Sequence, residues 1–531
     1  DAAGRVQAEV TYGIGYQVYF PQRMASGPIA FEGMRTAAEM VQWLDMESNG
    51  DIDGLPQRRT EYVNDSAGRR RFSIGPDGLA QEYIYDSLGQ VTETRQYGER
   101  VELRVWDEAE LSAHLAGISD VRVTRQEYDE VGNVVARFDA LQAVERFVYD
   151  ALGQLTSYTD KNQAVWTYQY DAAGNRTSET SPQVLVSKAD AAGNLTQSLR
   201  SVTTVIEYDV FGNVTRRIED VGTSTARAIE YEYDSRGLQV LTRFPDAGIM
   251  GPDGQLQASG FRPTVEVTYD VFGNAVMQKD TLGYYSYKTY DNAGRLRFDI
   301  DAEGQVSEFS YNALGQQTRL YRYAAAISVP AGTPVTSEQV AGLAQVQEGQ
   351  DRLIVTSYDA AGNKSRVAEV IQENTPWGVQ EKEGRITTYQ YNVFGEVVAE
   401  WTLTGSDSSL YWDYEEVTRY YYDDAGRRTH RVDVQGYVTA WEYNVNGEVI
   451  RETQYAHAGD GIPSDDDDGG GGWVPASAQP EFDPAFVGHN RVTEWEYDAL
   501  GRKIAERKSI GDPNNGFFIE SLTEYDASGR A

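Results

Sequence analysis

Apolar and polar residues alternate along this chain in short stretches, and each stretch ends in a turn-forming phrase. In residues 163–177, QAVWTYQYDAAGNRT, the aromatic residues Trp166, Tyr168 and Tyr170 occupy every second position, so a β-strand would carry all three on one face. The next four residues, Asp171 to Gly174, are typical of a turn, because Asp can bond its own downstream backbone and Gly adopts positive φ without steric cost. The pattern predicts a strand, a tight turn and a second strand.

The same phrase returns throughout the chain. Tyr, then Asp or Asn, two residues and Gly occur together fifteen times, beginning at Tyr85, Tyr128, Tyr149, Tyr170, Tyr208, Tyr233, Tyr269, Tyr290, Tyr311, Tyr358, Tyr391, Tyr422, Tyr443, Tyr497 and Tyr525. Two worn copies begin at Asn64 and Ala189, and the tightest spacing is 21 residues. Self-similarity at a fixed period predicts an array of stacked small units. We expect the motif Tyr side chains to be buried at strand ends and the motif Gly residues to have positive φ.

Each unit contains a second turn as well, as in Asp280 to Gly283 and Asp301 to Gly304, so that consecutive hairpins follow one another. We therefore predict an all-β fold, a long antiparallel strip of hairpins with a few short inserted helices. An open sheet of roughly thirty strands does not stay flat, and strands twist with a fixed hand. The strip should curl or spiral towards a hollow shell.

Helical patterns interrupt the repeats. Residues 30–44 have the periodicity of an amphipathic helix, and residues 107–117, DEAELSAHLAG, predict a short helix capped by Asp107 and ended by Gly117. In residues 324–350, a short helix is expected to start at Thr336 or Ser337 and to end at Leu343.

Two further interruptions have the composition of loops. Residues 240–262 are rich in Pro and Gly, and residues 455–490 contain four Asp followed by four Gly, which is typical of a flexible linker. The predicted organisation is a helical and loop segment at 1–60 and a β-strip at 61–531, with insertions near 107–120, 240–262, 324–350 and 455–490.

The phrases YDALGQLTSYTD, YDAAGNRTSET, YDVFGNVTRRIED and YNALGQQTRLYRY resemble the YD repeats of the bacterial Rhs family. Related arrays occur in the C component of insecticidal toxin complexes and in animal teneurins. The resemblance covers roughly residues 60 to 531 and implies a β-strip that spirals into a hollow shell, which in bacterial members encloses a C-terminal toxin. The chain lacks the family's DPxG-rich core and aspartate-dependent self-cleavage site, so we expect it to be an interior piece of a larger polypeptide.

Composition narrows the functional classes. Lys plus Arg is 47 and Asp plus Glu is 82, so the net charge is 47 − 82 = −35. Such a surface disfavours nucleic acid and anionic lipid, and it favours divalent cations and basic partners. There is no Cys, no apolar run approaches the ~18 residues of a membrane span, and the four His residues form no metal-spaced pair. We predict that the chain is not an enzyme.

One local motif suggests a calcium site. Four residues, Asp45, Glu47, Asn49 and Asp53, match positions 1, 3, 5 and 9 of an EF-hand-type loop, and Ile52 is the aliphatic at position 8. Together with Asp51, these four are the candidate calcium ligands. Gly50 stands where that loop turns sharply, and a helical pattern precedes it. Position 12 is Pro56 rather than Glu, so the bidentate ligand would have to come from elsewhere, such as Glu61. The alternative is an acidic polar linker between the helix and the first strand.

Two functions from different classes follow. In the first, the chain is a non-catalytic shell or scaffold segment of an Rhs-like protein. It would enclose or present a toxin or effector payload from the same larger polypeptide, with a secretion-apparatus or cell-surface partner. In the second, the strip is an extracellular adhesion stalk stiffened by calcium. Both place the protein outside a bacterial cell or on its surface, and neither requires a cofactor other than calcium.

Overall fold

A computed structural model describes residues 8–12, 57–189, 195–223, 226–246, 249–250, 256–257, 260–347, 349–375, 378–404, 416–458, 490–509 and 518–531. Within these residues, 32 strands form one antiparallel sheet. The strands pair in chain order, so the sheet is a continuous meander of hairpins, as the repeats predicted. The predicted all-β strip is therefore confirmed.

The first stretch of the strip contains β1 (Ala8–Tyr12), β2 (Gln57–Asn64), β3 (Arg70–Ile74), β4 (Leu79–Tyr85), β5 (Val91–Arg100), β6 (Val121–Tyr128), β7 (Val134–Phe138), β8 (Val144–Tyr149), β9 (Leu155–Thr159), β10 (Val165–Tyr170) and β11 (Arg176–Thr180). The middle stretch contains β14 (Thr203–Tyr208), β15 (Val214–Glu219), β16 (Arg227–Tyr233), β17 (Gln239–Arg243), β20 (Thr264–Tyr269), β21 (Ala275–Lys279), β22 (Tyr285–Tyr290), β23 (Leu296–Ile300), β24 (Val306–Tyr311) and β25 (Gln317–Arg322). The last stretch contains β26 (Arg352–Tyr358), β27 (Lys364–Thr375), β28 (Gly378–Tyr391), β29 (Val397–Thr404), β30 (Glu416–Tyr422), β31 (Arg428–Val432), β32 (Tyr437–Tyr443), β33 (Val449–Ala458), β34 (Arg491–Tyr497), β35 (Lys503–Ser509) and β36 (Phe518–Leu522).

Two hairpins leave the main sheet. β12 (Val184–Ala189) pairs with β13 (Leu195–Arg200), and β18 (Ile249–Met250) pairs with β19 (Leu256–Gln257). The main sheet stays continuous past each of these hairpins, because β11 pairs with β14 and β17 pairs with β20. The strands on either side of the worn repeat at Ala189 thus pair with each other outside the main sheet. The prediction of a plain loop at 240–262 was wrong in part, because this stretch includes the end of β17 and the small β18–β19 hairpin.

The turn after each motif Tyr has one repeated geometry, which we call the YD turn. In the unit of Asp171, the Asp N–H donates to the carbonyl of Asn175 (2.9 Å) and the N–H of Gly174 donates to the Asp carbonyl (3.1 Å). The Asp171 Oδ1 accepts the N–H groups of Ala173 and Asn175, both at 2.9 Å. Gly174 has a φ of 89°, and all fifteen motif glycines have positive φ, as predicted.

The motif tyrosines differ from the prediction, because all fifteen are half-buried rather than buried. Fourteen of them donate their hydroxyl to a backbone carbonyl of a preceding strand, as Tyr170 does to Leu155 at 2.9 Å and Tyr311 does to Leu296 at 2.8 Å. A ring in a single-layer sheet has neighbours on only one side, so it cannot be fully covered. The hydroxyl instead fastens each hairpin to the one before it.

Two short helices confirm the predictions for the interrupted stretches. α2 (Glu108–Leu115) is capped by Asp107, whose side chain accepts the N–H of Glu110, and it ends just before Gly117. α3 (Ser337–Leu343) is capped by Thr336, which forms a reciprocal capping box with Gln339. The predicted helix at 30–44 lies outside the described residues. So do positions 459–489 of the predicted linker, whereas 455–458 belong to β33.

Each helix covers an apolar patch of the sheet. α2 contributes Leu111 and Leu115 to a core that also contains Phe72, Ile74 and Tyr97. The core beneath α3 is a second, separate cluster, formed by Tyr287, Phe298, Ile300, Val306, Ile327 and Val340. The two insertions therefore supply the second layer that a β-strip needs to bury a core.

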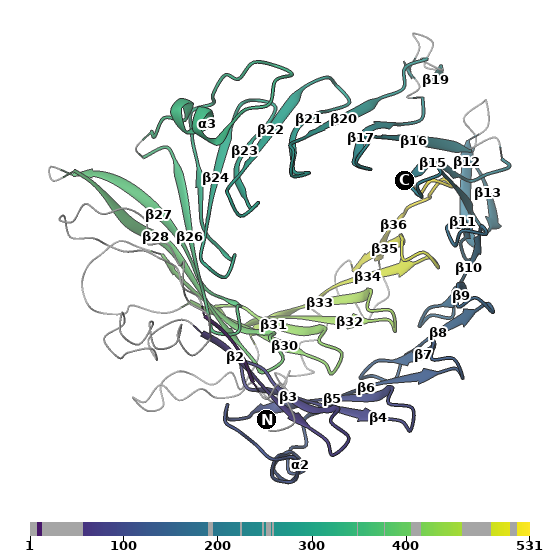
Figure 1. The fold of residues 1–531 in the computed structure, drawn as a ribbon, viewed down its shortest axis with the longest axis vertical. Coiled ribbons are helices and arrows are strands. Elements are labelled where there is room, and N and C mark those ends of the chain that lie inside the picture. The colour runs from purple at the N-terminus through teal and green to yellow at the C-terminus, as the bar shows by residue number, and fades with distance from the viewer. Residues whose placement is uncertain are drawn as a thin grey trace.

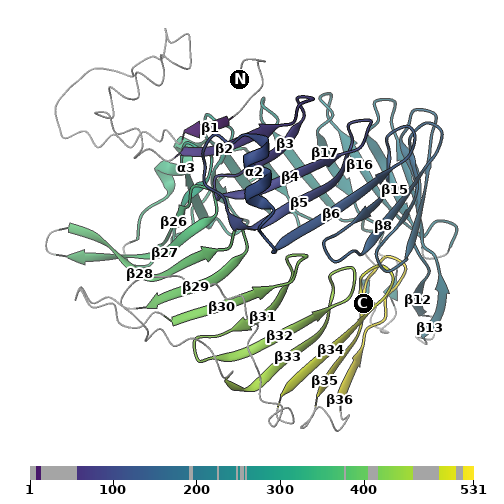
Figure 2. The same cartoon turned by 90° about the horizontal axis from the view of Figure 1, so that it is seen from below.

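The strip curls into a ring with both helices on its convex side (Figure 1). The curl exceeds one turn, and β30 to β36 run beneath the first strands in a second tier (Figure 2). On β22, Tyr287 belongs to the α3 core, so Tyr290, three positions later, lies on the opposite face of the strand. The motif tyrosines accordingly lie on the concave side.

Candidate functional site: the seam between two turns

The strip winds round more than once, and we call its successive windings the first and second turns of the spiral. The edges of these two windings meet along a seam, which brings together residues far apart in the sequence. The YD turns of the second spiral turn contact the opposite ends of the first-turn strands. Those ends carry the linking turns, which join one hairpin to the next as Asp280 to Gly283 does. Arg100, at the end of β5, donates its Nη2 to the carbonyl of Tyr391 at 3.2 Å. The alternation of hairpins therefore gives the spiral a polarity, with YD turns docked on linking turns.

The strongest contact of the seam involves Arg122 at the start of β6. Its Nη1 and Nη2 donate to the two carboxylate oxygens of Glu396, at 2.6 and 2.9 Å. The same guanidinium lies over the ring of Phe394, 3.7 Å from the ring centroid. Both charged side chains are largely buried, and a bidentate pair of this kind fixes the register of the two turns.

Further along the seam, Asn446 from a second-turn YD turn contacts a first-turn linking turn. Its Nδ2 donates to Asp160 Oδ2 at 2.7 Å, and its Oδ1 accepts the N–H of Asn162 at 3.2 Å. Asp160 is buried, and its Oδ1 also accepts the N–H of Ala164 at 2.7 Å. The carboxylate of Asp160 therefore closes this linking turn and also binds it to the second turn of the spiral.

The displaced β12–β13 hairpin forms the last contact of the seam. The N–H of Ser187 donates to the carbonyl of Tyr525 at 2.8 Å, and its hydroxyl donates to Glu524 Oε2 at 3.0 Å. Ser187 on β12, a strand outside the main sheet, therefore fastens the repeat at Tyr525 to the first turn.

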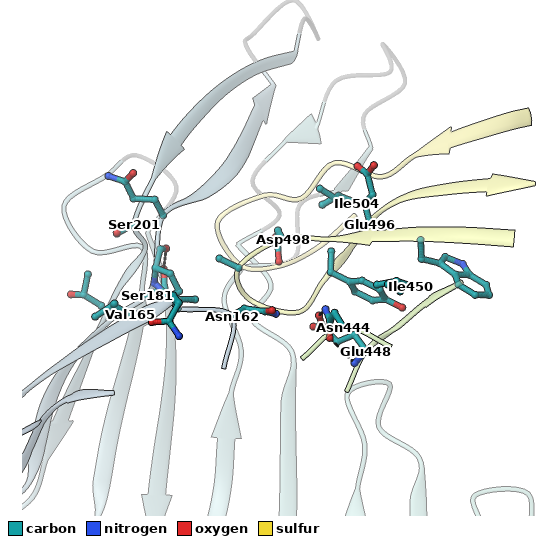
Figure 3. Close-up of a pocket in the computed structure, with 18 of the residues that line it drawn as sticks. Asn162, Val165, Ser181, Ser201, Asn444, Glu448, Ile450, Glu496, Asp498 and Ile504 are labelled. Atoms are coloured by element: carbon teal, nitrogen blue, oxygen red, sulfur yellow. Dashed lines mark hydrogen bonds between the residues drawn. The ribbon is translucent and has the colours of Figure 1, made fainter. Parts of the chain in front are cut away.

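A crevice of about 960 Å³ opens at this seam. Its walls include Asn162, Val165 and Ser181 of the first turn and Glu448, Trp495 and Asp498 of the second turn (Figure 3). The polar groups of the second wall already have partners. Arg502 Nε donates to Asp498 Oδ2 at 2.7 Å, and Trp495 Nε1 donates to Glu506 Oε2 at 3.0 Å. Asp498 and Trp495 thus make contacts within the second turn of the spiral.

The concave face presents aromatic side chains paired with carboxylates. Tyr158 donates its hydroxyl to Glu145 at 2.6 Å, and Trp441 Nε1 donates to Glu452 at 3.0 Å. Burial, followed by this hydrogen bond to Glu145, raises the pKa of Tyr158 well above its ordinary value. Such phenols stay neutral at physiological pH. The concave face is therefore amphiphilic, with aromatic rings and carboxylates side by side.

The predicted calcium ligands Asp45, Glu47, Asn49, Asp51 and Asp53 all lie outside the described residues. Glu61, the suggested extra ligand, is buried on β2 and accepts a hydrogen bond from Arg59 Nε at 2.5 Å. Within the described ranges, no group of three His, Asp or Glu side chains is arranged to hold a metal ion. His430 is half-buried beside Tyr421, and burial lowers its pKa.

Sequence reasoning did not find the seam. Arg122 and Glu396 are separated by 274 positions, and neither belongs to an unusual motif. One signal was present: Glu396 and Glu448 replace the Asn or Gln that follows the motif Gly in many first-turn repeats, such as Asn133 and Asn175. Identifying Arg122 as the partner of Glu396 requires the curvature of the sheet.

In the described part of the chain, no helix is long and apolar enough to cross a membrane.

Comparison with known proteins gives one family match, the RHS repeat, over residues 149–183. No curated protein matches the chain. Similar solved structures include TcdB2-TccC3-Cdc42, with 16% identity over 88% of this chain and 22% of that chain at a TM-score of 0.41. Another is the Photorhabdus luminescens Tc holotoxin pore carrying a TccC3 mutation, with 14% identity over 88% and 26% of the two chains and a TM-score of 0.31.

The chain spans about a quarter of the length of these structures. TM-scores this low leave the fold to be judged from the strand pairings of the chain itself. The matched residues 149–183 begin at a motif Tyr and cover β10 and β11, the region whose phrases resemble the Rhs family. Residues 149–183 therefore match the RHS repeat, the family that the YD phrases resemble.

Proposed function

We propose that the chain is a non-catalytic wall segment of an Rhs-like shell, which encloses or presents a toxin or effector payload from the same larger polypeptide. The observation that carries this proposal is the curl of a single continuous sheet into stacked turns that are locked together at the Arg122–Glu396 seam (Figure 2). Stacked turns make a wall, and the half-buried aromatic and carboxylate groups on its concave side can contact a polypeptide without a specific sequence.

A structural role is supported by how the polar groups are used. The motif Asp carboxylates close turns, the motif Tyr hydroxyls tie hairpins together, and the arginines of the seam join the two turns. We propose that the segment has no hydrolytic activity of its own. Turnover of a glycan, peptide or nucleotide by the purified chain, abolished by one substitution, would overturn that part.

We further propose a location outside the bacterial cell or on its surface, with a secretion-apparatus or cell-surface partner. The calcium loop at 45–53 belongs to this proposal. Weak binding, with a Kd of roughly 10⁻⁴–10⁻³ M, would suit an extracellular module. Calorimetric titration of calcium into wild type and into the Asp45→Ala/Asp51→Ala variant tests it. Identical flat titrations would show that this loop does not bind calcium.

The adhesion stalk is the second candidate. A stalk requires a strip that extends, whereas this strip curls on itself within the described residues (Figure 1). The curl supports the shell over the stalk.

The test is electron cryomicroscopy of the complete polypeptide to which this chain belongs. We expect density from outside the repeat array on the concave side of the strip. In parallel, Arg122→Ala removes the ion pair and the ring contact of the seam, so protease should reach the payload sooner. Arg236→Ala, at an exposed YD turn, is the matched control. A concave side without payload density would overturn the enclosing role. Equal cleavage of the payload in the wild type, Arg122→Ala and Arg236→Ala proteins would overturn it as well.

A further inference from the structure

Two YD turns of the second turn of the spiral have almost the same sequence. Residues 391–397 read YNVFGEV and residues 443–449 read YNVNGEV, so the two phrases differ only at Phe394 and Asn446. In each phrase the residue after the motif Gly is a glutamate that lies at the seam. Glu396 is bound by Arg122, whereas Glu448 lines the crevice. The molecule therefore offers an internal comparison of two equivalent carboxylates.

The two carboxylates are held in the same way by their own repeats. The Asn392 side chain donates its Nδ2 to Glu396 Oε2 at 2.6 Å, and the Asn444 side chain donates its Nδ2 to Glu448 Oε2. In both cases Oε1 lies against the glycine of the next YD turn. It is 2.8 Å from the point that a Cβ on that glycine would take in the first case, and 2.6 Å from it in the second. Glu448 therefore has the orientation that Glu396 uses to bind arginine.

The two sites differ in the cation that faces them. Arg122 donates to both carboxylate oxygens of Glu396, whereas in the described part of the chain Glu448 accepts from the neutral Asn444 amide and pairs with no cation. The residues that line the crevice include three carboxylates and no Lys, Arg or His. The neighbouring sequence stretches 190–194, 459–489 and 510–517 contain no Lys or Arg either.

The crevice is a fixed gap between the two turns of the spiral. Along the strip, it follows the contact of Asn446 with Asp160 and precedes the contact of Ser187 with Glu524, so the seam is fastened on both sides of it. Between these contacts, the β12–β13 hairpin replaces a tight linking turn. Both walls are described strands and turns, and neither outer edge of the strip contributes to them.

The size and the lining of the crevice suit a side chain with a long apolar stem. Its volume of about 960 Å³ is at the upper end of the range of about 300–1,000 Å³ that ligand pockets span. Val165, Ile450 and Trp495 line it together with the carboxylates (Figure 3). The Trp495 ring already has the Lys503 amine 4.5 Å from its centroid, so a cation is compatible with this wall.

We propose that the crevice binds an arginine side chain of a partner polypeptide, whose guanidinium pairs with Glu448 as Arg122 pairs with Glu396. A guanidinium is a planar fork that matches both oxygens of a carboxylate, whereas a lysine ammonium is a single point of charge. The net charge of −35 attracts every cation, so preference for arginine over lysine is the mark of this site. The proposal goes beyond the wall function, since it assigns recognition of a partner to the joint.

A fluorescence titration tests the proposal on the whole chain. The protein contains no cysteine, so Gln183→Cys, at an exposed lining residue, carries one environment-sensitive label. The probes are the peptide acetyl-Gly-Gly-Arg-Gly-Gly-amide and its counterparts with lysine or citrulline, at about 0.15 M salt to screen long-range attraction. We expect a saturable response to the arginine peptide, binding about tenfold or more weaker for lysine, and no response to the neutral citrulline. No saturable response to the arginine peptide, or equal binding of the lysine peptide, would overturn the proposal.

Glu448→Gln in the labelled protein tests the carboxylate itself. This change keeps the size of the side chain and removes its charge, so binding of the arginine peptide should weaken by about tenfold or more. Glu130→Gln, at an exposed YD turn of the first turn of the spiral, removes one charge elsewhere and is the matched control. Circular dichroism confirms that both variants are folded. Equal binding by the Glu448→Gln and Glu130→Gln proteins would show that the overall charge attracts the peptide, and it would overturn the site.

Discussion

Two stretches of the strip are built from the same repeat but are held together differently. β2 to β5 lie under α2, and their core of Phe72, Ile74 and Ala80 is completely buried. Of the next strands, β6 to β11, only β6 touches this core, through Val121 at its start. Their only buried apolar residues are two alanines, Ala136 and Ala164.

The difference shows that the repeat alone makes a strip, whereas an insertion makes a core. In the bare stretch, each hairpin depends on strand pairing, on the Asp-closed turn and on one Tyr hydroxyl, and each such hydrogen bond stabilises by about 0.5–1.5 kcal/mol. In the covered stretch, every buried apolar side chain adds about 1.5–3 kcal/mol. The covered stretches should therefore be the most stable parts of an array whose contacts are otherwise local.

The largest effect is expected when the cover is removed. Leu111→Ala deletes a completely buried side chain between α2 and the sheet, and it should lower the free energy of unfolding of this region by about 2–5 kcal/mol. Urea unfolding followed by tryptophan fluorescence measures it. Leu343→Ala, at the exposed end of α3, is the control and should change little. Equal losses from both variants would contradict a core under α2.

A smaller effect is expected from a bare YD turn. Gly153 has a φ of 78°, and the nearest atom to an added Cβ is Asn133 Oδ1 at 3.8 Å, so Gly153→Val adds backbone strain of about 1–3 kcal/mol rather than a Cβ clash. Gln142 already has a φ of 65° in a linking turn, so Gln142→Gly is the opposite control and should not destabilise. Thermal unfolding of both variants gives the comparison. A Gly153→Val protein as stable as wild type would show that the turn relaxes.

Removing one inter-hairpin bond should cost less still. Tyr170→Phe keeps the ring and loses only the hydroxyl bond to the Leu155 carbonyl, so we expect a loss of about 0.5–1.5 kcal/mol. Hydrogen exchange should show it at β9 to β11 alone. Tyr284→Phe, at an exposed linking turn, serves as the control. Faster exchange in distant strands would indicate that the units are more cooperative than proposed.

The turns also predict a pH dependence. A side-chain hydrogen bond from Asn175, with further backbone bonds, lowers the pKa of Asp171, so its contribution is present above about pH 4, the ordinary Asp value, and is lost as pH falls through the lower folded pKa. Burial raises the pKa of Tyr97 to about 12, so its contribution is complete below about pH 10 and is lost between there and 12. Unfolding of wild type and Asp171→Asn across pH should show these two limits. An Asp171→Asn protein with an unchanged acid limit would exclude this carboxylate.

The sequence predicted the strip because its determinants are local. Alternation from Trp166 to Tyr170 sets the strand, and Asp171 and Gly174 set the turn. Caps at Asp107 and Thr336 likewise predicted both described helices. The seam was not predictable, because the Arg122–Glu396 pair depends on the sum of small twists over many strands. Neither was the half-burial of the tyrosines, which follows from having only one layer.

Hydrogen exchange of the wild type and Leu111→Ala proteins, followed by mass spectrometry, tests the central claim most directly. We expect β3 to β5 of the wild type to exchange more slowly than β7 to β11. In Leu111→Ala this extra protection should disappear from β2 to β5, while β20 to β25 under α3 keep theirs. Equal protection of covered and bare strands in wild type, or uniform loosening of the whole chain in Leu111→Ala, would contradict it.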